Sequence, residues 1–249
     1  MTRRQCVSLL LALGLLATAS VALAGKPATL TATPLDPSLM VQGQSTVARP
    51  DCLFGNLNDP RYFVGDFLIG NEAYKFLFNP MQGSCQCPAG FQLRNVHIFL
   101  YAETQEQADV PLTMWVDLED AAWDPVRQCW VPGVQDCVSP PYTVTLGAPG
   151  LYDVTLPIPC DCAFLDYWYM ISVHFGPLDG YNDLPNIVVD AGPALTCYNW
   201  NNYNDEGWYD LTEINGWVWN LAMYADGDCC ETPVPAEDTS WGQVKQLYR

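Results

Sequence analysis

The 249-residue sequence has little positive charge, because 10 lysines and arginines stand against 28 aspartates and glutamates and give a formal net charge of -18. It has only two histidines, and no GxSxG, HExxH, P-loop or Rossmann pattern. An acidic surface repels phosphate, which argues against nucleic acid and anionic membranes as partners. Without these motifs we expect no catalytic residues, no organic cofactor and a protein that is not an enzyme.

Long hydrophobic runs are also missing, except for one at the N-terminus. Arg3 and Arg4 precede an apolar run from Val7 to Leu23, and a small-x-small end closes at Ala24. This order is typical of a signal peptide over residues 1–24; a transmembrane anchor is the alternative. Elsewhere no apolar stretch approaches the ~20 residues of a membrane-spanning helix. We therefore expect a secreted chain, extracellular or periplasmic, with no membrane span after cleavage.

Cysteine, in contrast, is abundant for an exported chain. Removal of the leader takes Cys6 away and leaves ten of the eleven cysteines, an even number that favours up to five disulfides over zinc ligation. Spacing suggests a Cys129–Cys137 pair, links between the CQC and CDC motifs, and a partner for Cys197 in the CC pair at its C-terminal side. The candidates are Cys52, Cys85, Cys87, Cys129, Cys137, Cys160, Cys162, Cys197, Cys229 and Cys230.

Short β-branched and aromatic runs separated by turn formers indicate an all-β protein. The pattern predicts one antiparallel β-sandwich of jelly-roll type over residues 51–231, with two smaller sandwiches as the alternative. Residues 25–50 are expected to be extended, with one early strand near Leu30 to Ala32, and residues 232–249 to form a linker and a short C-terminal helix. The predicted strands are 62–69, 74–78, 91–102, 110–118, 142–146, 152–158, 167–175, 187–189, 194–200 and 217–224.

An aromatic and amide-rich stretch, CYNWNNYNDEGWYDLTE, is the strongest hint of a binding site. Aromatic rings stack on the apolar faces of sugars while amides and carboxylates bind the hydroxyls. The alternative is that these rings pack inward and cover a sheet edge. The candidate ligand-binding residues are Tyr198, Trp200, Tyr203, Trp208 and Tyr209.

The many carboxylates allow two further hypotheses. Calcium prefers hard oxygen donors, and Asp183, Asp226 and Asp228 lie in turn-like sequence, although no EF-hand spacing is present. Two acids across a groove could instead cleave a glycosidic bond, but an acidic composition produces such pairs by chance. His97 and His174, both in predicted strands, could ligate a metal together, yet a histidine on a sheet face is more often structural.

The order CYNW, an acidic gap, GWYDL and then YADGDCC resembles a group of uncharacterised, secreted, cysteine-rich β-domain proteins of bacteria. The final SWGQVKQLYR is similar to the SWGxVKxLYR-like segment that closes such proteins. The resemblance runs from Cys52 to the end of the chain and implies no established activity or site.

The expectation from the sequence is therefore an exported, acidic, disulfide-bonded binding or cell-surface module without catalysis, whose partner is a glycan or a cell-surface protein. A structural protein of an extracellular layer or filament is the first alternative, and a carboxylate-pair glycoside hydrolase is the second.

Overall fold

The computed structural model describes residues 27–36, 52–55, 62–81, 87, 89–163, 168–204, 206–214 and 217–230. The predicted signal peptide, C-terminal helix and SWGQVKQLYR segment lie outside these residues. In the described part no helix is long and apolar enough to cross a membrane.

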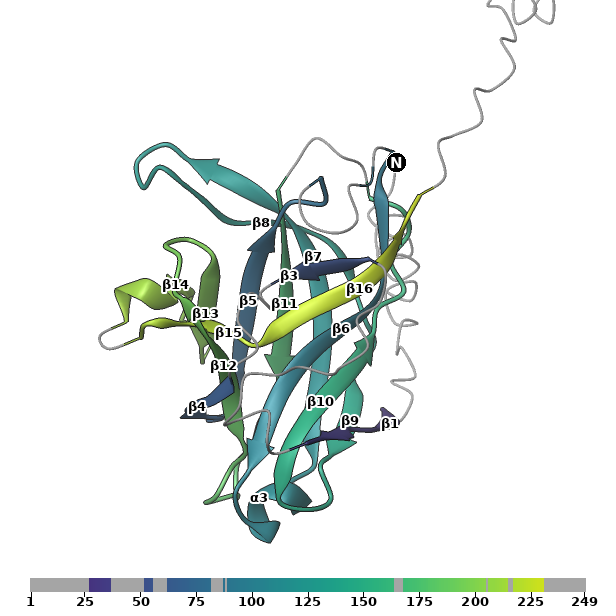
Figure 1. Ribbon diagram of the computed structural model, residues 1–249, viewed down its shortest axis with the longest axis vertical. Coiled ribbons are helices and arrows are strands. Elements are labelled where there is room, and N and C mark those ends of the chain that lie inside the picture. The colour runs from purple at the N-terminus through teal and green to yellow at the C-terminus, as the bar shows by residue number, and fades with distance from the viewer. Residues whose placement is uncertain are drawn as a thin grey trace, which may run out of the picture.

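Two eight-stranded sheets form the body of the molecule (Figure 1). The first, sheet A, has the order β1 (Ala28–Thr31), β9 (Tyr142–Thr145), β7 (Leu112–Asp124), β11 (Tyr169–Phe175), β5 (Glu72–Phe78), β13 (Asn199–Tyr203) and β14 (Trp208–Asp210), with β8 (Cys129–Val138) paired to β7. The second, sheet B, has the order β15 (Trp219–Leu221), β12 (Asn186–Pro193), β6 (Phe91–Ala102), β10 (Gly150–Pro157) and β2 (Thr33–Leu35). Strand β16 (Met223–Cys229) pairs with β6 and β3 (Leu53–Gly55), and β4 (Tyr62–Phe67) pairs with β12.

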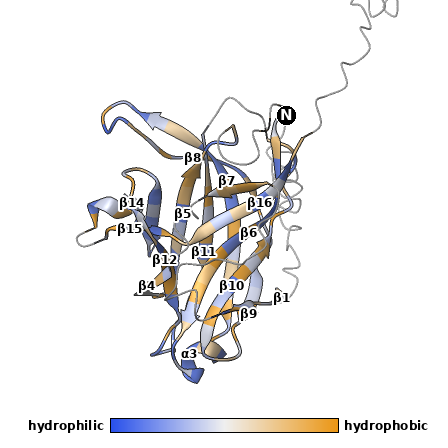
Figure 2. Cartoon of the chain, in the orientation of Figure 1, coloured by the Kyte–Doolittle hydropathy of each residue, from blue (hydrophilic) through white to orange (hydrophobic). Residues whose placement is uncertain are grey.

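The main hydrophobic core lies between the two sheets, and the period-two pattern of the strands explains it. In β6, Val96, Ile98 and Leu100 face this core, whereas Phe99 packs in a smaller cluster on the opposite face. Figure 2 shows apolar and polar residues interspersed along the strands and hydrophilic residues around the short helix α3 (Gln105–Asp109). The prediction of an antiparallel all-β sandwich is confirmed.

The N-terminal segment adds a strand to each sheet. Strand β1 pairs with β9 in parallel, and β2 pairs antiparallel with β10, while the buried Ala32 lies between the two strands. This β1–β9 pair departs from the expected antiparallel order. The single early strand predicted near Leu30 is in fact two strands, one per sheet.

Strand β8 was not expected, because its Pro-Gly sequence reads as a loop. It pairs with β7 through two register irregularities, and the β7–β8 hairpin projects beyond the body (Figure 1). Pro132 is tolerated because bulges and edge strands accept a missing donor. A Cβ on Gly133 would lie 2.1 Å from the carbonyl oxygen of Asp120, so only glycine allows the two strands to approach.

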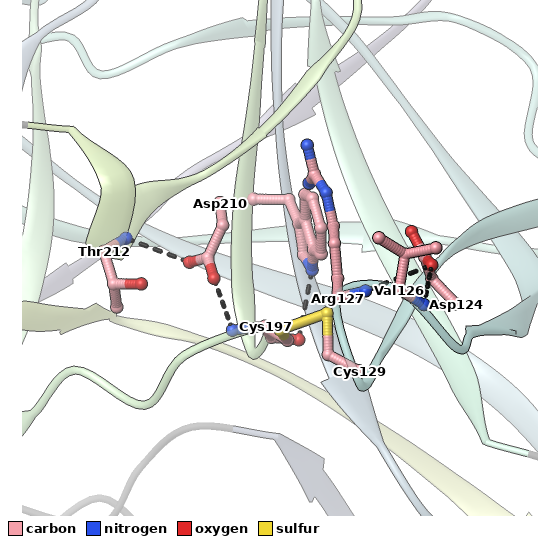
Figure 3. The surroundings of a disulfide bond; sticks show 8 residues. Asp124, Val126, Arg127, Cys129, Cys197, Asp210 and Thr212 are labelled. Atoms are coloured by element: carbon pink, nitrogen blue, oxygen red, sulfur yellow. Dashed lines mark hydrogen bonds between the residues drawn. A yellow bond between two sulfur atoms is a disulfide. The ribbon is translucent and has the colours of Figure 1, made fainter.

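The predicted strand 194–200 is wrong over most of its length, since the strand begins at Asn199. Cys197 has a positive φ of 66°, and Tyr198 N donates to the carbonyl of Leu195 to close a turn. The carboxylate of Asp210 then accepts hydrogen bonds from Cys197 N at 2.6 Å and from Thr212 N at 2.9 Å (Figure 3). A capped turn therefore replaces the start of the expected strand.

Four disulfides are described, and none has the predicted pairing. The Cys129–Cys137 link and the CQC-to-CDC links are wrong, and Cys197 does not meet Cys229 or Cys230. The bonds are Cys87–Cys229, Cys129–Cys197, Cys137–Cys160 and Cys162–Cys230, and Cys52 is also disulfide-bonded. Cys85 lies outside the described residues. Disulfides of this number indicate an oxidising compartment.

Candidate functional site

The five rings of the aromatic stretch do not form one platform. Trp200 is 1% exposed, and its indole donates to the carbonyl of Cys197 at 3.1 Å, so it packs beneath the Cys129–Cys197 disulfide and meets no ligand. Tyr198 and Trp208 pack against the same cluster and are only partly exposed. The inward-packing alternative is therefore correct for Trp200.

Tyr203 and Tyr209 are exposed but lie on the other face of the β13–β14 pair. Tyr209 is opposite Asn201, whereas Trp208 is opposite Asn202, and neighbouring residues of a strand point to opposite faces. The five predicted residues are thus divided between two faces of the sheet edge. Among the predicted rings, Trp208 and Tyr198 are partly exposed on the face that we call the outer face of sheet A.

The outer face of sheet A is the side turned away from the main core. Tyr74 and Phe76 of β5 and Val116 and Leu118 of β7 face the core. The residues that alternate with them face outward and include an unusual set of polar groups. Lys75, Asp117, Glu119 and Ser172 are buried, and His174 is partly exposed.

Lys75 is the centre of this set, because it is fully buried and its Nζ lies 2.5 Å from Oε2 of Glu119. The two side chains come from β5 and β7 and meet across β11, which lies between these strands. Burial disfavours both charges: it lowers the pKa of Lys75 and raises the pKa of Glu119, and the attraction between them offsets only part of each shift.

Asp117 and His174 form a second contact on the same face. His174 Nε2 lies 2.9 Å from Asp117 Oδ2, which also accepts a hydrogen bond from Gln135 at 3.0 Å. Burial works against the charge of Asp117, but the effects of its neighbours, chiefly the contact with His174 and also the charge of Lys75, together outweigh it and hold the pKa of Asp117 below its usual range. Ser172 lies directly opposite Asp117, yet Ser172 Oγ and Asp117 Oδ1 lack a hydrogen bond of normal geometry in the described part.

Two tryptophan rings lie against Lys75 and His174. The Trp208 ring covers Lys75, with Nζ 3.8 Å from the ring centroid, as in a cation–π contact. Trp115 stacks on His174 with centroids 5.0 Å apart, and the edge of His174 approaches Trp208 at 6.3 Å. Because one side of Trp208 rests on Lys75, its other side is the one that a ligand can meet. We call Trp115, His174 and Trp208 the ring patch.

Further aromatic side chains continue along the same face. Trp123 contacts Trp130 at 5.4 Å, Trp130 contacts Trp168 at 6.0 Å, and Trp168 contacts Tyr198 at 6.4 Å between ring centroids. Eight residues separate Trp115 from Trp123 on β7, which corresponds to about 26 Å along an extended strand. The outer face thus offers aromatic contacts over the length of a short polymer chain.

His97 belongs to a different cluster, on the outer side of sheet B. Its Nδ1 lies 2.9 Å from Asp153 Oδ1 and its Nε2 lies 2.8 Å from Asp226 Oδ2, while its ring stacks on Tyr224 at 4.2 Å. Burial opposes the imidazolium, but the hydrogen bonds to both carboxylates prevail and raise the pKa of His97 to about 9. Because His97 and His174 belong to different sheets, the hypothetical metal pair does not form.

The three calcium candidates are not brought together. Asp226 is bonded to His97 and Asn95 on β6, Asp228 forms an ion pair with Arg94, and Asp183 accepts from Thr104 beyond the far end of β6. Nine residues from Asn95 to Thr104 correspond to about 30 Å. Among the described residues, the one group of three metal-binding side chains is Cys52, Cys87 and Cys229, which are all disulfide-bonded.

Two hollows lie away from the ring patch. One, of 410 Å³, is lined by Asp120, Asp136 and Asp161 beside the Cys137–Cys160 bond. Partial burial and the neighbouring Asp120 raise the pKa of Asp136 to about 6. The other, of 440 Å³, is lined by Asp183 and Tyr181 and contains no ring of the aromatic stretch.

The sequence contains some signals for the polar residues of the outer face, which were not predicted as site residues. A lone lysine within the apolar strand EAYKFLF and the alternation of Trp115, Asp117 and Glu119 in MWVDLE both place polar groups on one face. What the sequence could not show is that Trp208, from a distant strand, covers Lys75.

No protein-family model, no curated protein and no solved structure matches this chain.

Proposed function

We propose that the protein is an exported glycan-binding module and that the ring patch on the outer face of sheet A is its binding surface. The single observation that carries this proposal is the flat indole of Trp208, which is supported from below by Lys75 and approached by His174, on which Trp115 stacks. A ring held in place before binding loses little conformational freedom when a sugar stacks on it.

The chemistry around the rings suits a neutral or basic sugar. Gln135 is exposed beside Asp117, and Asn202 lies opposite Trp208, so amide groups are available for hydroxyls next to the stacking surface. The net charge of -18 disfavours polyanionic glycans. Binding occurs without catalysis in this proposal, because Asp117 and Glu119 are buried and each already contacts a basic side chain.

The test is binding to a glycan array, followed by titration with the oligosaccharides that score positive. Trp208→Ala and Trp115→Ala should each weaken binding by about tenfold or more, because each removes a large aromatic contact. Tyr209→Ala is the matched control, since it removes an exposed ring from the adjacent position of β14 but on the opposite face. Equal losses in all three variants, or no binding to any glycan by the wild-type protein, would contradict the proposal.

A protein-contact role is the second candidate, and the β7–β8 hairpin favours it. Val126 is 90% exposed, Val134 is 72% exposed and Trp123 is 51% exposed on this projecting hairpin. Sedimentation of the full chain tests it: concentration-dependent association that Val126→Asp and Val134→Asp abolish would support a layer or filament protein. A monomer at all concentrations would leave that candidate without support.

A further inference from the structure

Lys75 is buried, whereas most lysines lie on the protein surface. It is the one lysine among the described residues, it is 0% exposed, and its neighbours are Glu119, Asp117 and the Trp208 ring. A buried ion pair is seldom more stabilising than a hydrophobic pair of the same size, because both charges lose their hydration. The ion pair alone is therefore a weak reason for placing a lysine here.

The two side chains are in direct contact. The amine nitrogen lies 2.5 Å from Oε2 of Glu119, so it is also close to Cδ, which is one carbon–oxygen bond away from that oxygen. Two groups fixed within reacting distance behave as if at a very high concentration, with effective molarities of about 10⁵ M or more in favourable cases. Trp208 lies over the nitrogen and excludes water from one side of it.

The directions of the two pKa shifts also favour a reaction between these side chains. Burial lowers the pKa of Lys75 and raises the pKa of Glu119, so both shifts favour the neutral amine and the neutral acid. A desolvated lysine amine is a nucleophile, and a protonated carboxyl group can lose its hydroxyl as water.

We propose that Lys75 and Glu119 form an intramolecular amide bond that cross-links β5 to β7 across β11. The nitrogen lone pair of the Lys75 amine attacks Cδ of Glu119, so the C–N bond forms and the C–OH bond breaks. One hydrogen from the nitrogen joins the departing hydroxyl, and one water molecule leaves. No oxidant, reductant or other reactant is needed.

The cross-link would join strands that share no hydrogen bonds with each other, since each pairs with β11 instead. It would therefore fix the middle of sheet A, beneath the ring patch, independently of the disulfides. The inference does not depend on glycan binding, because it concerns only the chemistry of the two side chains.

Mass spectrometry of the full chain after complete reduction and alkylation tests the proposal. Once every cysteine is reduced and alkylated, the wild-type chain should be lighter by one water than the mass calculated from its sequence with every cysteine alkylated. Trypsin should then fail to cleave after Lys75 and should yield residues 62–94 joined to residues 95–127, which contain Glu119. Fragmentation of this joined peptide should place the link at Glu119.

Lys75→Arg is the matched control, since it keeps a cation on a long stem but has no primary amine. It should show the full mass and a separate peptide 95–127, and circular dichroism reports whether it folds. The wild-type result alone decides the question if this variant does not fold. A wild-type chain of full mass that is cleaved after Lys75, or a link located at another residue, would overturn the proposal.

Discussion

The His97 cluster makes the pH dependence of stability a quantitative prediction. In the folded protein the two carboxylates of Asp153 and Asp226 raise the pKa of His97 to about 9, against an unfolded value near 6.5. A raised pKa means that the folded state holds the proton more tightly than the unfolded chain. The stabilisation is complete below about pH 6.5 and is lost as the pH rises to about 9, and it amounts to about 3 kcal/mol.

Tyr224 and Asp226, which contact His97, do not titrate between about pH 6.5 and 9. Burial and the contact with Asp153 raise the pKa of the Tyr224 phenol, so that it stays protonated throughout. The His97 contact keeps the pKa of Asp226 below its usual range despite burial, so this carboxylate titrates only in acid. Asn95 and Thr155 also contact the cluster and carry no charge.

The assay is urea unfolding with the disulfides intact, measured at intervals from pH 6 to pH 9.5. The wild-type free energy of unfolding should fall by about 3 kcal/mol, and His97→Gln should lack this fall. His174→Gln is the matched control, because it removes the other histidine and leaves the His97 cluster in place. The reasoning is refuted if His97→Gln shows the same fall as the wild type, or if the wild type shows none.

Three further changes test the packing. Replacing Cys129 and Cys197 together by serine should lower stability by about 4 kcal/mol, because the bond closes a separation of 68 residues, and thermal unfolding would measure the loss; an unchanged melting temperature would contradict this. Gly227→Ala should lower the free energy of unfolding by about 1–3 kcal/mol, since its Cβ would lie 2.3 Å from the carbonyl oxygen of Gln92. Gly180→Ala is the comparison: Gly180 has open space around it but a positive φ, so this change should lower stability only through backbone strain. Lys75→Met should destabilise by about 3 kcal/mol or more, because it leaves the carboxyl group of Glu119 buried without Lys75. The double change with Glu119→Leu removes that carboxyl group and should be more stable than Lys75→Met in urea unfolding; a double variant no more stable than the single one would refute the reasoning.

The parts of the fold that the sequence predicted are those set by local alternation. Strand β6 was predicted with its observed bounds because Val96, Ile98 and Leu100 repeat with period two, which is the pattern of a half-buried strand. Strand β8 was missed because Pro132 and Gly133 read as a turn. Only the β7 partner, with its irregular register, shows that these residues lie in a strand.

The disulfides and the candidate site depended on contacts between distant segments. Cys197 is 68 residues from Cys129, and the turn that brings them together is fixed by Asp210 from another strand (Figure 3). In the same way, the ring patch can be recognised only from the structure, which shows Trp208 over Lys75. The sequence shows which residue types are present but not which of them lie together. Trp200 and Tyr209, both predicted to bind a ligand, lie on opposite faces of the β13–β14 pair.

The most direct test of a glycan-binding outer face is the titration of the indole N–H signals by nuclear magnetic resonance. An oligosaccharide that scores positive on the array should shift the signals of Trp115 and Trp208 and leave the buried Trp200 unchanged. Uniform shifts of all indoles, or shifts confined to tryptophans outside sheet A such as Trp219, would contradict the account.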